Sequence, residues 1–177
     1  TEKPSESEFN ILFICSWSED EPIQEVVTAA EMLLEKQSLK IFITGKPKLK
    51  KYLSSNKIPS NVVLTGFLPE DEFDNLIHNS DVIIDLTTRD NCMVCGAYEA
   101  VSAGTPAILS DNNAMRSYFD MGMEFTNNSA IDIADKIILI IKNLEQKKQE
   151  ILTLKHKIEK RQKKSISLIL DALSKDK

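Results

Sequence analysis

The chain has 177 residues and a mass of 20.0 kDa, the size of one domain, and a domain of this size buries roughly 70% of its unfolded surface. Apolar residues make up 42% and charged residues 28%, with only 5 Gly and 6 Pro, which excludes a disordered, collagen-like or low-complexity chain. A net charge of −5 argues against a nucleic-acid binder, and no apolar run approaches the roughly 20 residues of a membrane-spanning helix.

Short apolar runs alternate with stretches of helical periodicity along the first 110 residues. The runs that predict strands are 9–15, 39–44, 61–65, 81–86 and 106–110. The stretches that predict helices are 22–36, 48–56, 69–79 and 95–103, with Pro22 as the first helical residue. Because the strands are apolar throughout and do not alternate, we expect a parallel sheet that is buried on both faces and has right-handed helical crossovers.

Polar segments stand at both ends of this pattern. We interpret residues 1–8 (TEKPSESE), which lack an initiating Met and a signal peptide, as a linker or chain boundary. After the last strand come a short apolar piece at 123–126, a helix over 130–141 and a long polar helix from about 144 to 173. The prediction is therefore a linker at 1–8, a three-layer α/β/α Rossmann-like domain at 9–142 and a C-terminal polar and basic helix at 143–177.

The loop after the 81–86 strand carries the richest set of polar residues. In doubly wound sheets ligands bind beyond the carboxyl ends of the strands, where loops and helix N-termini meet. Amides at 94–96 would hold a diphosphate, with Gly96 allowing a close approach, and Glu99 would accept two hydroxyl hydrogens from a ribose. The alternative is an ordinary loop and helix with Glu99 in solvent, and spacing alone does not decide between the two.

The run GAYEAVSAGTPAILSD resembles the donor-binding segment of GT-B glycosyltransferases, especially family 4, the glycosyl transferases group 1. Positions that match the family pattern in register are Glu99, Ala100, Gly104, Pro106 and Ile108. The preceding stretch NVVLTGFLPEDEFDNLIHNSDVIIDLT is similar to the strands and helix that lead into that motif. The resemblance covers residue 9 to about 141 and implies the C-terminal, donor-binding half of a GT-B fold.

The resemblance also implies roles for particular residues. Glu99 would hold the ribose of a UDP- or GDP-linked sugar, and Asn91 and Asp90 would meet the sugar itself. It also places the amides of Val94, Cys95 and Gly96 at the diphosphate, and Gly66 and Phe67 near the base. Lys46 or Arg89 would substitute for basic residues that the family has at the diphosphate and this chain lacks, and Ser16 is a further candidate for donor binding.

Three departures from the family pattern stand beside this match. Asn91 replaces the first of the family's paired glutamates and cannot act as a carboxylate. Cys92 and Val94 replace glycines of the phosphate loop. The acidic segment 19–21 stands where the family has the Arg and Lys that neutralise the diphosphate, and three acids there are unfavourable.

Two other sites are suggested by short patterns. Cys92 and Cys95 have the spacing of a redox pair or half a zinc site, but zinc needs two more ligands, and the only histidines, His78 and His156, fall on unrelated predicted helices. We interpret the thiols as structural or incidental. The acids at 19–21 resemble the magnesium corner of receiver domains, but the third strand ends VVLTG, without the Asp such a domain needs.

Asp85, inside a strand run, is predicted to be a solvated strand end or a buried hydrogen-bonded carboxylate.

The function implied is donor binding in a glycosyltransferase that moves a sugar from a nucleoside diphosphate to a glycan or lipid-linked acceptor. The family places the acceptor on an N-terminal domain of the same parent protein, so this chain alone would bind donor without turnover, and no metal or cofactor is required. Catalytic residues stay unassigned. One alternative is a non-catalytic glycosyltransferase-like domain acting in assembly or regulation. Another is an unrelated sugar-nucleotide enzyme such as an epimerase, whose early glycine-rich loop is absent because 15–21 contains no Gly.

The long C-terminal helix adds a prediction about location. Its apolar stripe, Ile151, Leu154 and Ile158, would lie across the domain, and the basic residues around EKRQKK would lie in water or meet anionic lipid. With only three cysteines and no leader sequence, we expect a cytoplasmic protein, with a peripheral contact at the inner face of the membrane as the sharper hypothesis.

Overall fold

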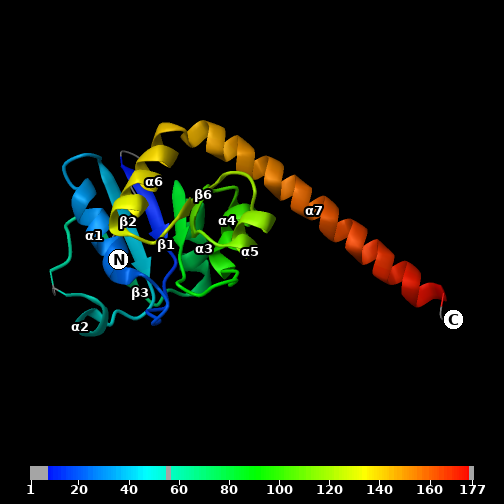
Figure 1. The fold of residues 1–177 in the computed structure, drawn as a ribbon, viewed down its shortest axis with the longest axis horizontal. Helices are drawn as coiled ribbons and strands as arrows, with labels where there is room; N and C mark the ends of the chain where they lie inside the picture. The colour runs from blue at the N-terminus through cyan, green and yellow to red at the C-terminus, as the bar shows by residue number, and fades with distance from the viewer. Residues whose placement is uncertain (1–7, 55–56, 176–177) are drawn as a thin grey trace.

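A six-stranded parallel sheet forms the centre of the computed structural model, which describes residues 8–54 and 57–175 (Figure 1). In chain order the strands are β1 (Phe9–Phe13), β2 (Leu39–Thr44), β3 (Val62–Gly66), β4 (Val82–Asp85), β5 (Ala107–Ser110) and β6 (Met123–Thr126). Their spatial order is β3-β2-β1-β4-β5-β6, so the order reverses between β1 and β4. The predicted Rossmann-like parallel sheet is confirmed, and its ligand-binding switch point lies at the carboxyl ends of β1 and β4.

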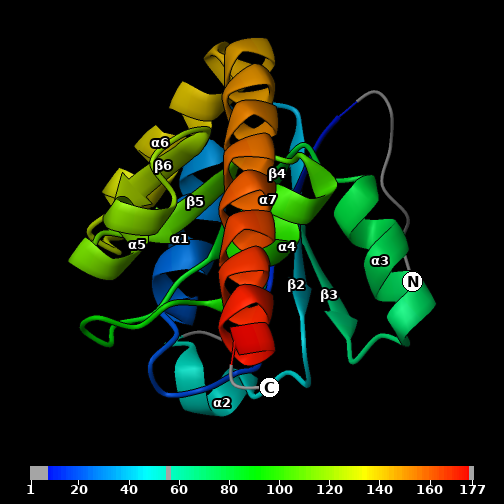
Figure 2. The same cartoon turned by 90° about the vertical axis from the view of Figure 1, so that its right-hand side faces the viewer.

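Helices cover both faces of the sheet (Figures 1 and 2). One layer is α1 (Ile23–Leu33), α2 (Leu49–Tyr52) and α6 (Ala130–Lys142). The other is α3 (Glu70–His78), α4 (Cys95–Ala103), α5 (Asn113–Tyr118) and the first half of α7 (Leu144–Lys175). Neighbouring residues of β1 show why two layers are needed: Ile11 and Phe13 belong to the α1/α6 core, whereas Leu12 belongs to the α4/α7 core.

Several boundaries differ from the prediction. Pro22 precedes α1 as its cap residue and is not the first helical residue, because its ψ of 62° is not helical. The helix predicted over 48–56 is limited to the single turn of α2, since Leu53 is extended, and its residues 55–56 lie outside the described residues. The predicted linker also lies outside them, apart from Glu8.

Two elements at the β5 end of the sheet were not expected. Residues 123–126, predicted only as an apolar piece, form the edge strand β6, paired with β5 from Ala107↔Met123 to Ser110↔Thr126. The six-residue helix α5 is too short to give a periodic signal. It is held at its start by Asn112, whose side chain accepts a hydrogen bond from the Met115 amide at 2.9 Å.

The long helix α7 has an inner half on the domain and an outer half that projects from it (Figure 1). The predicted stripe is confirmed, because Ile151, Leu154 and Ile158 are buried against the α4 layer, and Figure 2 shows α7 lying over α4. Gly122 lets α7 approach closely, since a Cβ there would lie 2.6 Å from the Cβ of Ile151. In the part of the chain that the structure describes, no helix combines the length and apolarity needed to cross a membrane.

Candidate functional site

The loop that follows β1 folds around one carboxylate, that of Glu21. One oxygen of Glu21 accepts from the Ser16 amide at 2.8 Å, and the other accepts from the Ser18 amide at 2.6 Å. The Ser16 hydroxyl donates to the first oxygen at 3.0 Å. Trp17, between the two amides, has a φ of 61°, the left-handed conformation that turns successive amides toward one point.

Buried contacts hold this loop in shape. Trp17 is fully buried, and its indole nitrogen donates to the Thr44 carbonyl at 2.9 Å. The Cys15 amide donates to the Thr44 hydroxyl at 2.9 Å, and the Lys48 ammonium donates to the Trp17 carbonyl at 3.0 Å. Gly45 has no room for a side chain, because a Cβ would lie 2.3 Å from the Cys15 carbonyl oxygen. The left-handed Trp17 is therefore held by tertiary packing against the end of β2.

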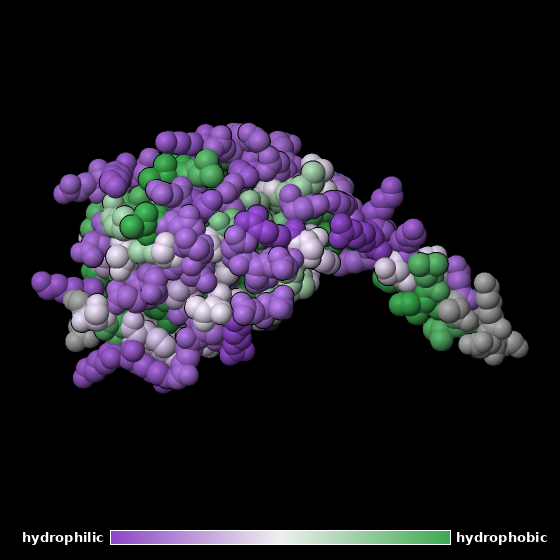
Figure 3. All heavy atoms as spheres, viewed as in Figure 1, coloured by the Kyte–Doolittle hydropathy of each residue, from purple (hydrophilic) through white to green (hydrophobic). Residues whose placement is uncertain are grey.

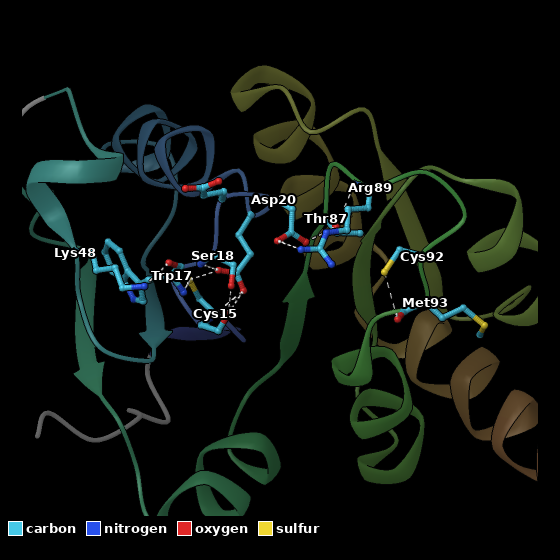
Figure 4. A network of polar contacts seen from close by, with 12 residues as sticks. Cys15, Trp17, Ser18, Asp20, Lys48, Thr87, Arg89, Cys92 and Met93 are labelled. Atoms are coloured by element: carbon cyan, nitrogen blue, oxygen red, sulfur yellow. Dashed lines mark hydrogen bonds and ion pairs between the residues drawn. The ribbon is translucent and has the colours of Figure 1, made fainter.

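Asp20 joins this loop to the loop that follows β4, across the switch point (Figure 4). Its carboxylate accepts from the Thr87 hydroxyl at 2.8 Å and from the Arg89 guanidinium at 3.2 Å, and its carbonyl accepts from the Thr88 amide at 2.7 Å. Arg89, which the sequence offers to a diphosphate, is thus paired with an acid of the chain itself. Its side chain is 69% exposed, so the ion pair is open to exchange with an incoming anion.

The start of α4 is capped from the end of β4. Asp85 is buried and accepts a hydrogen bond from the Gly96 amide at 2.7 Å. Burial raises the pKa of Asp85 to about 7; the nearby charges of Glu21 and Asp20 act in the same direction, and the Gly96 hydrogen bond opposes them. The predicted buried hydrogen-bonded carboxylate is confirmed, and Gly96 is needed because a Cβ there would lie 2.5 Å from an Asp85 oxygen.

The predicted donor contacts spread along the carboxyl edge of the sheet. Asp90 and Asn91 are exposed in the β4–α4 loop, with Asn91 at a φ of 53°. Val94 is the residue before α4, Cys95 and Glu99 are exposed on it, and Gly96 is buried. Within the described ranges, the Glu99 carboxylate has no hydrogen bond or ion pair.

Four predicted residues lie on the other side of the switch point from α4. Ser16 is exposed after β1, and Lys46 is exposed after β2. Gly66 ends β3 with a φ of 74°, and the Phe67 ring beside it is 88% exposed. Because β3 is three strands from β4, these two residues are roughly 14 Å along the edge from the end of β4.

A small polar pocket opens at the ends of β4, β5 and β6, and of its lining residues sequence analysis predicted only Arg89 and Asp90. Its volume is about 120 Å³, and it is lined by 87–90, 110–112 and 126–128. Asn128, at a φ of 66°, donates to the Thr87 carbonyl at 3.0 Å and shares a 2.7 Å hydrogen bond with the Ser110 hydroxyl. The Asn-Asn-Ser turn directly after the apolar piece at 123–126 is the signal that marks this strand end.

The hydrogen bonds between the loop amides and Glu21 also have a signal in the sequence. Ser18-x-x-Glu21 has the spacing of a capping box, in which the glutamate accepts from the amide of the serine. Cys15 is drawn into the same group: burial, followed by the charge of Glu21, raises the pKa of this thiol, which donates to Glu21 at 3.4 Å. Cys92 and Cys95 are free thiols, and among the residues described here no cluster of His, Cys, Asp and Glu could hold a metal ion.

Comparison with known families identifies the chain. The sequence model of the family described as glycosyl transferases group 1 matches residues 2–164. The chain belongs to this family. The resemblance seen in the Glu99 motif is therefore confirmed.

Solved structures agree on the fold of this group 1 domain. It is similar to Anabaena Alr3699/HepE in complex with UDP, with a TM-score of 0.73 and 15% identity over 94% of this chain and 49% of that one. It is also similar to the sucrose-phosphate synthase of Thermosynechococcus elongatus, with a TM-score of 0.69 and 13% identity over 94% and 46%. The chain thus spans less than half of either protein. A comparison with curated protein sequences finds no match.

One matched structure has about the size of this chain. The catalytic domain of cholesterol-alpha-glucosyltransferase from Helicobacter pylori has a TM-score of 0.68 and 18% identity, over 85% of this chain and 96% of that one. At these identities the likeness concerns the fold, which is the Rossmann-like half of a GT-B architecture.

Proposed function

We propose that this domain binds a nucleoside-diphosphate sugar, UDP- or GDP-linked, at the carboxyl edge of its sheet, as the donor half of a glycosyltransferase. The observation that carries the proposal is Glu99. It stands in register in the family motif, one turn inside α4, exposed and unpaired among the described residues. A free carboxylate at this position is suited to accept two hydroxyl hydrogens from a ribose.

Transfer of the sugar needs an acceptor hydroxyl across a cleft. We assign the acceptor, a glycan or a lipid-linked glycan, to an N-terminal domain of the same parent protein, in keeping with a chain that spans less than half of the HepE and sucrose-phosphate synthase structures. In this proposal the domain alone binds donor without turnover. The diphosphate is bound without a metal ion or cofactor, by α4 and by Arg89 once that side chain leaves Asp20.

The test is a titration of the isotope-labelled domain with UDP, GDP and their sugars, followed by heteronuclear NMR. We expect shifts in the amides of 90–104 and a loss of at least about tenfold in affinity for Glu99→Ala. Glu31→Ala, an exposed glutamate on α1, is the matched control and should bind as the unmodified chain does. Equal affinity of both variants contradicts the assignment of Glu99.

A second candidate function is a non-catalytic glycosyltransferase-like domain that acts in assembly or regulation. The observation that favours it is the acidic switch point, where the Ser16 and Ser18 amides are bonded to Glu21 and Arg89 is paired with Asp20. A folded sample that binds no nucleoside diphosphate, alone or joined to its N-terminal domain, supports this function. Saturable binding of any nucleoside diphosphate contradicts this second candidate function.

We also propose that the outer half of α7 contacts an anionic membrane, at its cytoplasmic face. The basic residues Lys160, Arg161, Lys163 and Lys164 are followed by apolar side chains that are 57–62% exposed: Ile166, Leu168, Ile169, Leu170 and Leu173. Figure 3 shows this apolar patch near the outer end of the helix. Basic charge beside exposed apolar residues matches the chemistry of an anionic lipid surface.

Liposome sedimentation tests the contact. The protein should sediment with vesicles that contain phosphatidylglycerol and should stay in the supernatant with vesicles of phosphatidylcholine alone. Ile169→Glu should abolish sedimentation with the anionic vesicles, whereas Leu139→Glu, on α6, should not. Equal sedimentation with both lipid compositions contradicts the proposal.

A further inference from the structure

The β1–α1 loop is a main-chain anion site whose occupant comes from the chain itself. The amides of Ser16 and Ser18 flank a left-handed Trp17, an arrangement in which backbone N–H groups converge on a negative group. The group at their focus is the Glu21 carboxylate, and both of its oxygens are engaged. Dissolved phosphate and the diphosphate of a nucleotide have the chemistry that this focus accepts.

The site stands at the place in the fold where such a ligand would arrive. It is at the carboxyl end of β1, on one side of the switch point, and Asp20 of the same loop reaches the β4–α4 loop on the other side (Figure 4). Ser16 is exposed and Glu21 is half-buried, so an anion from solvent can reach the two amides once Glu21 turns away.

Two features make Glu21 an effective occupant. It is joined to the site by only a few residues, so its local concentration is far above that of a dissolved ligand. The surroundings also oppose a second anion, because Asp20 belongs to the same loop and two nearby cations are already engaged, Lys48 with the Trp17 carbonyl and Arg89 with Asp20.

We propose that Glu21 is a built-in anion that fills the backbone phosphate site of the β1–α1 loop and thereby sets how tightly the domain binds a nucleoside diphosphate. The inference rests on the proposed function, since it concerns the diphosphate of that donor. The diphosphate reaches the Ser16 and Ser18 amides only when the Glu21 side chain leaves them. Glu21 is an affinity-determining residue and takes no part in chemistry.

The decisive variant is Glu21→Gln, and the matched control is Glu19→Gln. Both remove one negative charge from the same loop, but the Glu19 side chain is 82% exposed and pairs with Lys51 at 2.9 Å. The probe is inorganic pyrophosphate, which needs no base or ribose site, followed by NMR. We expect Glu21→Gln to bind pyrophosphate about tenfold tighter than the unmodified chain, with shifts centred on Ser16 and Ser18. Glu19→Gln should stay within about twofold.

Equal gains for the two variants would show a general charge effect and overturn the proposal, as would a Glu21→Gln variant with no gain. If Glu21→Gln does not fold, the unmodified chain decides, because saturating pyrophosphate must shift the Ser16 and Ser18 amides together with the Glu21 carboxyl carbon. Pyrophosphate that leaves these three signals unchanged overturns the proposal. If the domain fails to bind UDP while these results hold, the proposed function is wrong, and Glu21 then controls only the binding of pyrophosphate to the loop amides.

Discussion

Two sets of carboxylates face the carboxyl edge of the sheet, and they differ in what they contact. Asp20, Glu21 and Asp85 each accept hydrogen bonds from the chain's own amides or hydroxyls at the switch point. Glu99, on the exposed side of α4, has no such partner within the described residues. The first set stabilises the two loops on either side of the switch point, whereas the unpaired Glu99 is the residue that we propose for donor binding. Acidic residues at a predicted binding edge therefore divide into structural and ligand-facing ones only through their partners.

The largest effect should come from Asp85, the most buried of these carboxylates. Because its folded-state pKa of about 7 lies above the ordinary 3.8, the folded chain retains a proton that the unfolded chain loses. Its contribution to stability is complete below pH 3.8 and is lost as pH rises to about 7, a change on the order of 4 kcal/mol. Asp85→Asn keeps an acceptor for Gly96 and should flatten this part of the profile.

Urea denaturation of the unmodified chain and of Asp85→Asn, at intervals from pH 4 to pH 8, measures how the free energy of unfolding of each depends on pH. Two profiles that stay parallel through this range would show that Asp85 is not the titrating group.

A smaller effect should come from closing the space between Asp85 and α4. Gly96→Ala places a Cβ within 2.5 Å of an Asp85 oxygen and 2.8 Å of Ile14 Cδ1, so α4 must shift. We expect a loss of about 2 to 3 kcal/mol in the free energy of unfolding, as for other overpacked core positions. Ser102→Ala, exposed on the same helix, should change it by less than about 0.5 kcal/mol. Thermal unfolding that shows the same loss of stability for Gly96→Ala and Ser102→Ala would contradict the close packing of Gly96 against Asp85 and Ile14.

The smallest effect compares the two kinds of carboxylate directly. Glu21→Gln leaves at least one of the Ser16 and Ser18 amides without its oxygen, which should lower the free energy of unfolding by about 1 to 2 kcal/mol. Glu99→Gln should change stability by less than about 0.5 kcal/mol while weakening donor binding. Chemical denaturation and the UDP titration, run on both variants, separate stability from binding. A Glu99→Gln variant that loses as much stability as Glu21→Gln would contradict the distinction between structural carboxylates and the unpaired Glu99.

Prediction from sequence succeeded where the signal is local. The α4 boundaries, residues 95–103, match the prediction because Gly104 adopts the left-handed conformation that ends a helix. The buried stripe of α7 was likewise readable from its helical spacing. Prediction failed for α5, which is shorter than two turns, and for the sheet role of β6, which its pairing with β5 decides.

The sequence by itself determined the order of strands and helices from β1 to β5, the family motif around Glu99 and the excess of acid after β1, because each depends on residues that are consecutive in the chain. Only the tertiary structure decided which acids are occupied. Asp20 meets Thr87 across 67 positions of the chain, and Trp17 is held left-handed by Thr44. Such contacts depend on which strands become neighbours in the sheet, and no local pattern carries that information. The same charge therefore stabilises a loop at Glu21 and stays available to a ligand at Glu99.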